Sequence, residues 1–98
     1  MKQRKKNKPR QFMLSPRAHG KLYRLCQWVA AIPDDIELGD DAWNQIEDKW
    51  QTTLQKQLGR EEIVRIELEG AQLVAYVWEY TEGETKETRI PVVKRGIR

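Results

Sequence analysis

Basic side chains crowd the first quarter of the sequence. The first 24 residues hold nine lysines and arginines and no aspartate or glutamate. Cationic side chains in such a segment can pair with the phosphates of nucleic acid, because the counterions that they release supply free energy of binding. A shorter basic run ends the chain. The residues predicted to contact nucleic acid are Lys2, Arg4, Lys5, Lys6, Lys8, Arg10, Arg17, Lys21, Arg24, Lys94 and Arg95.

The charge is segregated along the chain. The formal net charge is +3 at pH 7, yet residues 12–93 hold nine basic residues against all 15 acidic ones, a net charge of −6. Phosphate contacts position a protein on nucleic acid without reading its bases. We therefore expect binding that is largely independent of sequence, and both DNA and RNA stay open as partners.

Residues 1–11 are predicted to form a disordered basic arm, because they are almost free of apolar groups and repel one another. Residues 12–98 are predicted to form a single domain. Two other roles for the arm stay open, a solubility tail and a partner for the acids of the domain. The arm has no apolar anchor among its charges, which disfavours a membrane surface as its partner.

Three aromatic residues on one predicted strand form a second candidate surface. Tyr76, Trp78 and Tyr80 alternate with aliphatic residues, so their rings share one face. Rings that face outward could stack on single-stranded bases. Rings that face inward would pack against Trp43 and Trp50. We favour the inward arrangement, because three bare rings are a large apolar surface for a domain of this size.

The chain has few residues of the types that catalysis and metal binding require. Cys26 is the only cysteine and His19 the only histidine, which excludes an intramolecular disulfide and the common zinc sites. No glycine-rich phosphate loop or nucleophile motif occurs. We expect a protein without enzymatic activity, metal or cofactor, with Cys26 buried as a small apolar side chain.

Acidic residues gather between the two predicted helices. Their spacing lacks the alternating oxygen ligands of a calcium loop. The favoured interpretation is helix capping within a solvated connector, and the alternative is a docking site for a basic segment, either the arm of the same chain or that of a second copy. The residues are Asp34, Asp35, Glu37, Asp40 and Asp41.

Local signals predict two helices that would position these groups. Ser15 followed by Pro16 marks a helix start, and apolar residues recur at helical spacing until Pro33 stops the helix. A second helix is predicted from a Gly39 cap to Leu58, with Gly59 as a left-handed stop. Its apolar stripe is the clearest helical pattern in the chain.

Alternating patterns after residue 60 predict strands over residues 64–69, 73–80 and 85–93, with turns at Gly70 and Gly83. Pro91 favours an edge position for the last strand. The apolar residues 12–14 are expected to lie extended on the domain. The predicted fold is α+β, with two helices on one face of a three-stranded antiparallel meander in the order α-α-β-β-β.

We therefore predict a small nucleic-acid-binding accessory protein. The alternative is a protein-interaction module, which would use its acidic body, the edge strand over residues 85–93 and its aromatic surface, with a homodimer as one version. No signal peptide or apolar stretch of about 20 residues is present, so the expected location is the cytoplasm.

Overall fold

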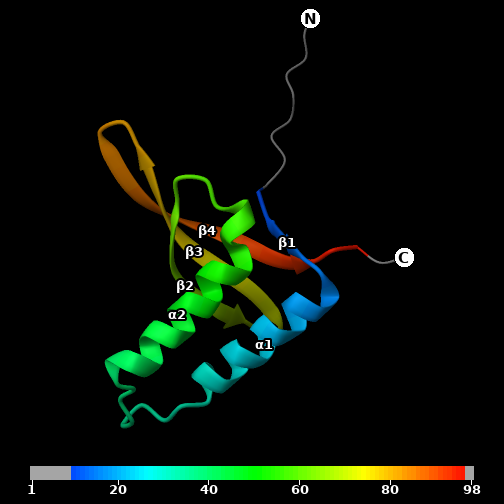
Figure 1. Cartoon of the computed structure of the whole chain (residues 1–98), viewed down its shortest axis with the longest axis vertical. Coiled ribbons are helices and arrows are strands. Elements are labelled where there is room, and N and C mark those ends of the chain that lie inside the picture. Colours follow the sequence, from blue (N-terminus) through cyan, green and yellow to red (C-terminus); the bar gives the residue numbers. More distant parts are fainter. Residues whose placement is uncertain (1–9, 97–98) are drawn as a thin grey trace, which may run out of the picture.

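Two helices lie against one face of a four-stranded sheet in the computed structural model of the chain, which describes residues 10–96 (Figure 1). The α+β class and the two helices are as predicted. The disordered arm is predicted over residues 1–11, of which residues 1–9 lie outside the described part of the chain. The elements are β1 (Phe12–Leu14), α1 (Pro16–Ala30), α2 (Asp40–Leu54), a short 3-10 helix (Gln55–Gln57), β2 (Glu62–Glu69), β3 (Gln72–Thr81) and β4 (Glu84–Lys94).

The predicted three-stranded antiparallel sheet is wrong by one strand. β1 pairs in parallel with the end of β4, opposite Val92 to Lys94, and gives a mixed sheet in the order β1-β4-β3-β2. The last part of β4 is therefore an interior strand and not the predicted edge. Pro91 comes just before the residues of β4 that pair with β1. At Pro91, β4 is paired only with β3 among the described strands, and a proline is tolerated at such an edge position.

A side chain closes the outer edge of β1. The Gln57 amide accepts a hydrogen bond from the Met13 N–H and donates one to the Met13 carbonyl, both at 2.9 Å. These two bonds satisfy the backbone groups that an edge strand would otherwise offer to another chain. The 3-10 helix after α2 thus holds β1 in place.

Helix α1 starts where the sequence indicates, and α2 ends earlier. The Ser15 hydroxyl accepts a hydrogen bond from the Ala18 N–H at 3.2 Å, as predicted for an N-cap. Helix α2 begins after Gly39, but its α-helical part stops at Leu54. The predicted left-handed stop at Gly59 is wrong, because the chain already leaves the helix at Leu58 with extended dihedrals.

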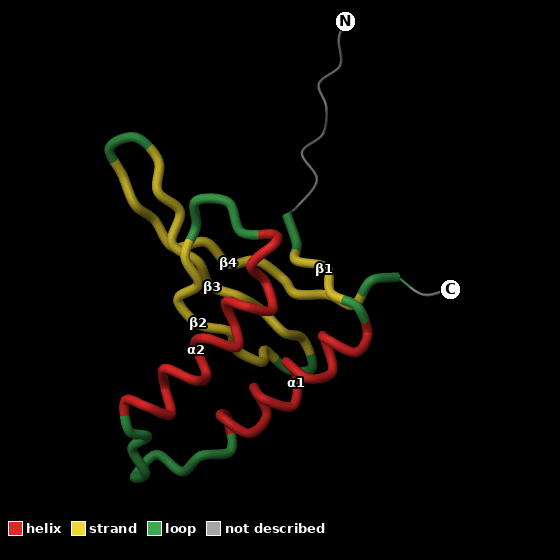
Figure 2. Tube along the Cα trace, viewed as in Figure 1, coloured by secondary structure: helices red, strands yellow, loops and turns green. Residues whose placement is uncertain are grey.

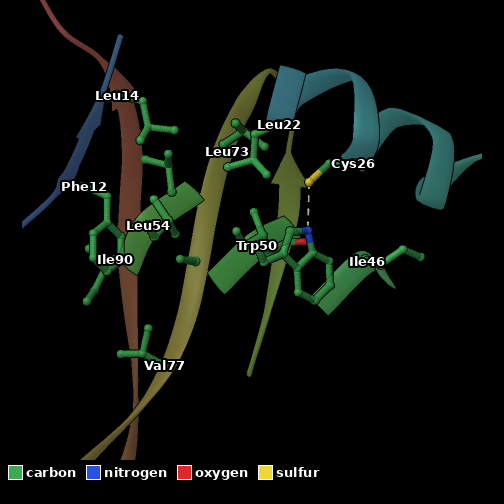
Figure 3. Close-up of a cluster of buried hydrophobic side chains, with 13 residues drawn as sticks. Phe12, Leu14, Leu22, Cys26, Ile46, Trp50, Leu54, Leu73, Val77 and Ile90 are labelled. Carbon is green, nitrogen blue, oxygen red and sulfur yellow. Dashed lines mark hydrogen bonds between the residues drawn. The ribbon is translucent and has the colours of Figure 1, made fainter. Parts of the chain in front are cut away.

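The core lies between the helices and the sheet face that bears Leu73, Ala75 and Val77 (Figure 3). The predicted burial of the aromatic rings is wrong. Trp78 is 36% exposed and Tyr80 46% exposed, because they project from the other face of β3. Aliphatic side chains fill the space under the helices instead. The other core residues are Phe12, Leu14, Leu22, Cys26, Ile46, Trp50, Leu54, Ile66, Ile90 and Val92.

Cys26 is buried under α1, as predicted, and burial raises the pKa of its thiol to about 11. We expect iodoacetamide to alkylate the native protein at pH 8 about a hundredfold more slowly than the protein in guanidinium chloride, because the thiolate is the nucleophile. Mass spectrometry of the adduct over time measures both rates. Equal rates would show that Cys26 is accessible in the native state.

Candidate nucleic-acid interface

An open groove of about 700 Å³ runs between the two helices, which lie side by side in front of the sheet (Figure 2). The residues on both walls come from the middle of α1 and from the second half of α2. Six of the eight lining residues are polar or charged, and the other two are leucines. The lining residues are Lys21, Leu22, Arg24, Leu25, Asp48, Lys49, Thr52 and Thr53.

Three cations from two elements converge on this groove. Lys21 and Arg24 come from α1, and Lys49 comes from α2. All three are exposed, and none of them forms an ion pair with another residue in the range 10–96. Asp48 is the only acid in the lining, so the groove has an excess of positive charge. An anion held here would meet cations from both walls.

The remaining predicted contacts of the domain lie beyond one end of the groove. Arg17 is exposed one turn before Lys21 on the same side of α1. The backbone N–H of Arg95 donates to the Leu14 carbonyl at 2.6 Å, directly before the start of α1. Lys94 and Arg95 therefore begin the C-terminal segment beside the helix start (Figure 1).

Arg10 has a different environment from the other predicted site residues. Its guanidinium donates to Glu61 at 2.6 Å and to the Gln57 carbonyl at 3.1 Å, and it lies 5.4 Å from the centre of the Phe12 ring. These contacts anchor the chain to the domain. The Arg10 guanidinium, which is predicted to contact phosphate, is therefore already paired with Glu61. The other arm cations of the prediction, Lys2, Arg4, Lys5, Lys6 and Lys8, lie outside the described residues.

The hydrogen bond from Arg10, with help from the Gly59 N–H, lowers the pKa of Glu61 to about 2 from an ordinary value of 4.5. Arg10→Gln should reduce the free energy of unfolding by about 1 kcal/mol at pH 7, since partial exposure of Arg10 screens the pair. A lowered folded-state pKa adds stability above the unfolded value, and this stability is lost as the pH falls. The difference between the two proteins should therefore shrink from pH 4.5 towards pH 2, as measured by urea unfolding. A pH-independent difference would contradict the role of Glu61.

The outer face of the sheet has cations that are already paired. Arg65 bonds Glu67 at 2.7 Å and Glu87 at 3.2 Å, and Arg89 bonds Glu69. The Arg65 guanidinium also lies 4.0 Å from the centre of the Tyr76 ring. With Glu62, which lies opposite Trp78, the face has four acids against two cations and is negative, which disfavours phosphates.

The exposed aromatic rings stand in the same acidic surroundings. Trp78 is flanked across the sheet by Glu62 on β2 and Glu87 on β4. The Tyr80 hydroxyl donates to Glu62 at 2.7 Å, and the Tyr76 hydroxyl donates to Glu69. Carboxylates this close would repel the backbone of a nucleic acid strand stacked on the rings. The geometry therefore favours the groove over the aromatic face as the candidate interface.

Lys49 is the groove residue that sequence reasoning missed. It is the one basic residue of α2, and it stands next to an acid in an otherwise acidic helix. The apolar stripe shows which side of α2 meets the sheet, and Lys49 directly precedes the buried Trp50. Nothing in the local pattern shows that α1 lies on that flank of α2. Only the packing of the helices brings Lys49 opposite Lys21 and Arg24.

Comparison of the chain with protein-family models, curated proteins and solved structures found no match. Residues 10–96 contain no group of three or more histidine, cysteine, aspartate or glutamate side chains that could hold a metal ion. Neither helix in this part of the chain has the length and apolar character needed to cross a membrane.

Proposed function

We propose that this protein binds nucleic acid through the phosphate backbone, without catalysis and largely without sequence preference. The observation that supports the proposal is the convergence of Lys21, Arg24 and Lys49 on one groove while they pair with no acid in residues 10–96. The arginines on the outer face of the sheet serve as an internal comparison, because acids neutralise them. Unpaired cations that share a groove are the groups that phosphates can bind without first displacing a carboxylate.

The other basic groups extend this interface on the side of the α1 start. Arg17 continues the line of Lys21 and Arg24 along the helix, and Lys94 and Arg95 approach the same end through β4. Residues 1–9 precede Arg10, and their cations would add contacts to phosphates of the nucleic acid outside the groove. Binding at several phosphates by separate side chains explains why we expect weak discrimination between base sequences.

A salt titration tests the proposal. Binding of the full chain to random duplex and single-stranded oligonucleotides is measured by fluorescence anisotropy between 50 and 200 mM salt. If about four duplex phosphates are contacted, the log–log slope should be about −3.6, and affinity should fall about a hundredfold across this range. A variant without residues 1–9 keeps the Arg10 anchor and should show a shallower slope. Absence of binding at 50 mM salt, or a slope near zero, would refute the proposal.

The alternative function is the binding of a protein partner by strand addition on β4. The structure supports it less than the sequence does. β1 pairs with the end of β4, and Gln57 occupies the outer edge of β1. On β4 itself a partner strand would find room only beside the residues before Val92, while β2 forms the other edge of the described sheet. Self-association through this edge stays a prediction that light scattering tests.

A further inference from the structure

A second groove, of about 470 Å³, lies where the loop joins the end of α1 to the start of α2, far from the start of α1 (Figure 1). Its lining residues differ in type from those of the basic groove, because six of its eight are apolar, against two of eight in the basic groove. Ile36 is 53% exposed and Trp43 38% exposed. Exposed apolar grooves on small proteins are typical of sites where another protein binds. The lining residues are Val29, Ile32, Pro33, Asp34, Ile36, Glu37, Leu38 and Trp43.

The helix start explains only part of this apolar surface. Leu38 and Trp43 flank the Gly39 cap in the positions of a hydrophobic staple, and Leu38 packs partly against the core. That role leaves Ile36 and much of the Trp43 ring in solvent. A turn in which the Ile36 N–H donates to the Pro33 carbonyl at 3.0 Å fixes the loop beside the groove. The groove is thus formed before any partner binds.

The charges around the apolar groove show what kind of partner fits. Residues 31–48 contain no lysine or arginine. None of the acids in that stretch forms an ion pair within the part of the chain that the structure describes. This surface repels nucleic acid and attracts cationic segments. The acids near the groove are Asp34, Asp35, Glu37, Asp40 and Asp41, of which Asp34 and Glu37 line it.

We infer that this groove binds a basic amphipathic helix of another protein, with apolar side chains on Ile36 and Trp43 and lysines or arginines opposite the acidic rim. The basic segments of this chain do not fit that description. Residues 2–10 contain no apolar anchor, and residues 94–98 contain a single isoleucine. The inference is independent of nucleic-acid binding, because it uses a separate groove of opposite charge.

A synthetic helical peptide of about 14 leucines and lysines, spaced so that the leucines share one face, serves as the probe. One control peptide has the same composition in scrambled order, and another replaces lysine by glutamate. The four tryptophan indole N–H signals of the labelled full chain are assigned by tryptophan-to-phenylalanine variants and followed by NMR during titration. The Trp43 signal should shift with the amphipathic basic peptide, while the Trp78 signal on the outer sheet face stays in place.

Two variants and a matched control complete the test. Asp34→Asn with Glu37→Gln removes two charges from the rim and should weaken peptide binding about fivefold, and Ile36→Ser should weaken it about tenfold. Glu82→Gln with Glu84→Gln removes the same charge from the β3–β4 turn and should leave the affinity unchanged. Thermal melts check that each variant is folded. The inference is overturned if the Trp43 signal does not move, if the scrambled peptide binds equally well, or if both charge variants lose the same affinity.

Discussion

Replacement of Lys21, Arg24 and Lys49 together by glutamine is expected to weaken binding to duplex DNA by about a hundredfold at 100 mM salt. The three side chains are exposed and line one groove, so each substitution removes a phosphate contact without disturbing the core. The log–log salt slope should become shallower by about 2.7, since each lost contact releases about 0.9 fewer counterions. Anisotropy titrations of wild type and variant at several salt concentrations measure both quantities.

A general loss of positive charge would also weaken binding, so the experiment needs a variant with the same net charge. Lys56→Gln, Arg60→Gln and Lys86→Gln together remove three exposed cations that do not line the groove. This control should lose only a few-fold in affinity, because distant charges act through a screened field. Equal losses in the two triple variants would show that the groove is not the binding site, even if the protein still binds nucleic acid.

Local features of the fold followed from the sequence, because local interactions determine them. Ser15 before Pro16 predicts the start of α1, and the structure places the Ser15 hydroxyl on the Ala18 N–H. Gly70 and Gly83 predict the two turns of the meander, and both have positive φ. In each case the signal and its structural consequence lie within a few residues of each other.

Features that depend on distant partners were missed or assigned wrongly. Three residues cannot show a strand period, and the partner of Phe12 is Val92, eighty positions away. Strand alternation separates the two faces of β3 but does not say which one the helices cover, so Tyr76, Trp78 and Tyr80 were placed in the core. The same limit applies to the basic groove, since the opposition of Lys49 to α1 arises only from helix packing.

The two grooves give the molecule two ends of opposite chemistry. The basic groove and the start of α1 lie on one side, and the apolar groove with its acidic rim lies at the loop between the helices. If both proposals hold, one chain could bind nucleic acid and a basic protein at the same time, because neither surface overlaps the other. The acids at the loop would also keep nucleic acid away from the protein-binding end.

Phe12→Ala is expected to lower the free energy of unfolding by about 3 to 5 kcal/mol, which is a large part of the total stability of a domain of this size. Phe12 is only 1% exposed and packs in the core, although it belongs to a strand of only three residues. Its loss leaves a cavity in the core and removes an apolar contact of β1, which pairs with β4. Urea unfolding followed by circular dichroism measures the change.

Met13→Ala provides the matched control, because Met13 belongs to the same strand and points to the other side, where it is 37% exposed. The hydrogen bonds of Met13 to Gln57 involve its backbone and survive the substitution. We therefore expect a loss below about 1 kcal/mol. A similar cost for both substitutions, or a small cost for Phe12→Ala, would mean that β1 does not complete the core in solution. The anchoring of Arg10 would then need a different explanation, since it depends on β1 pairing with β4.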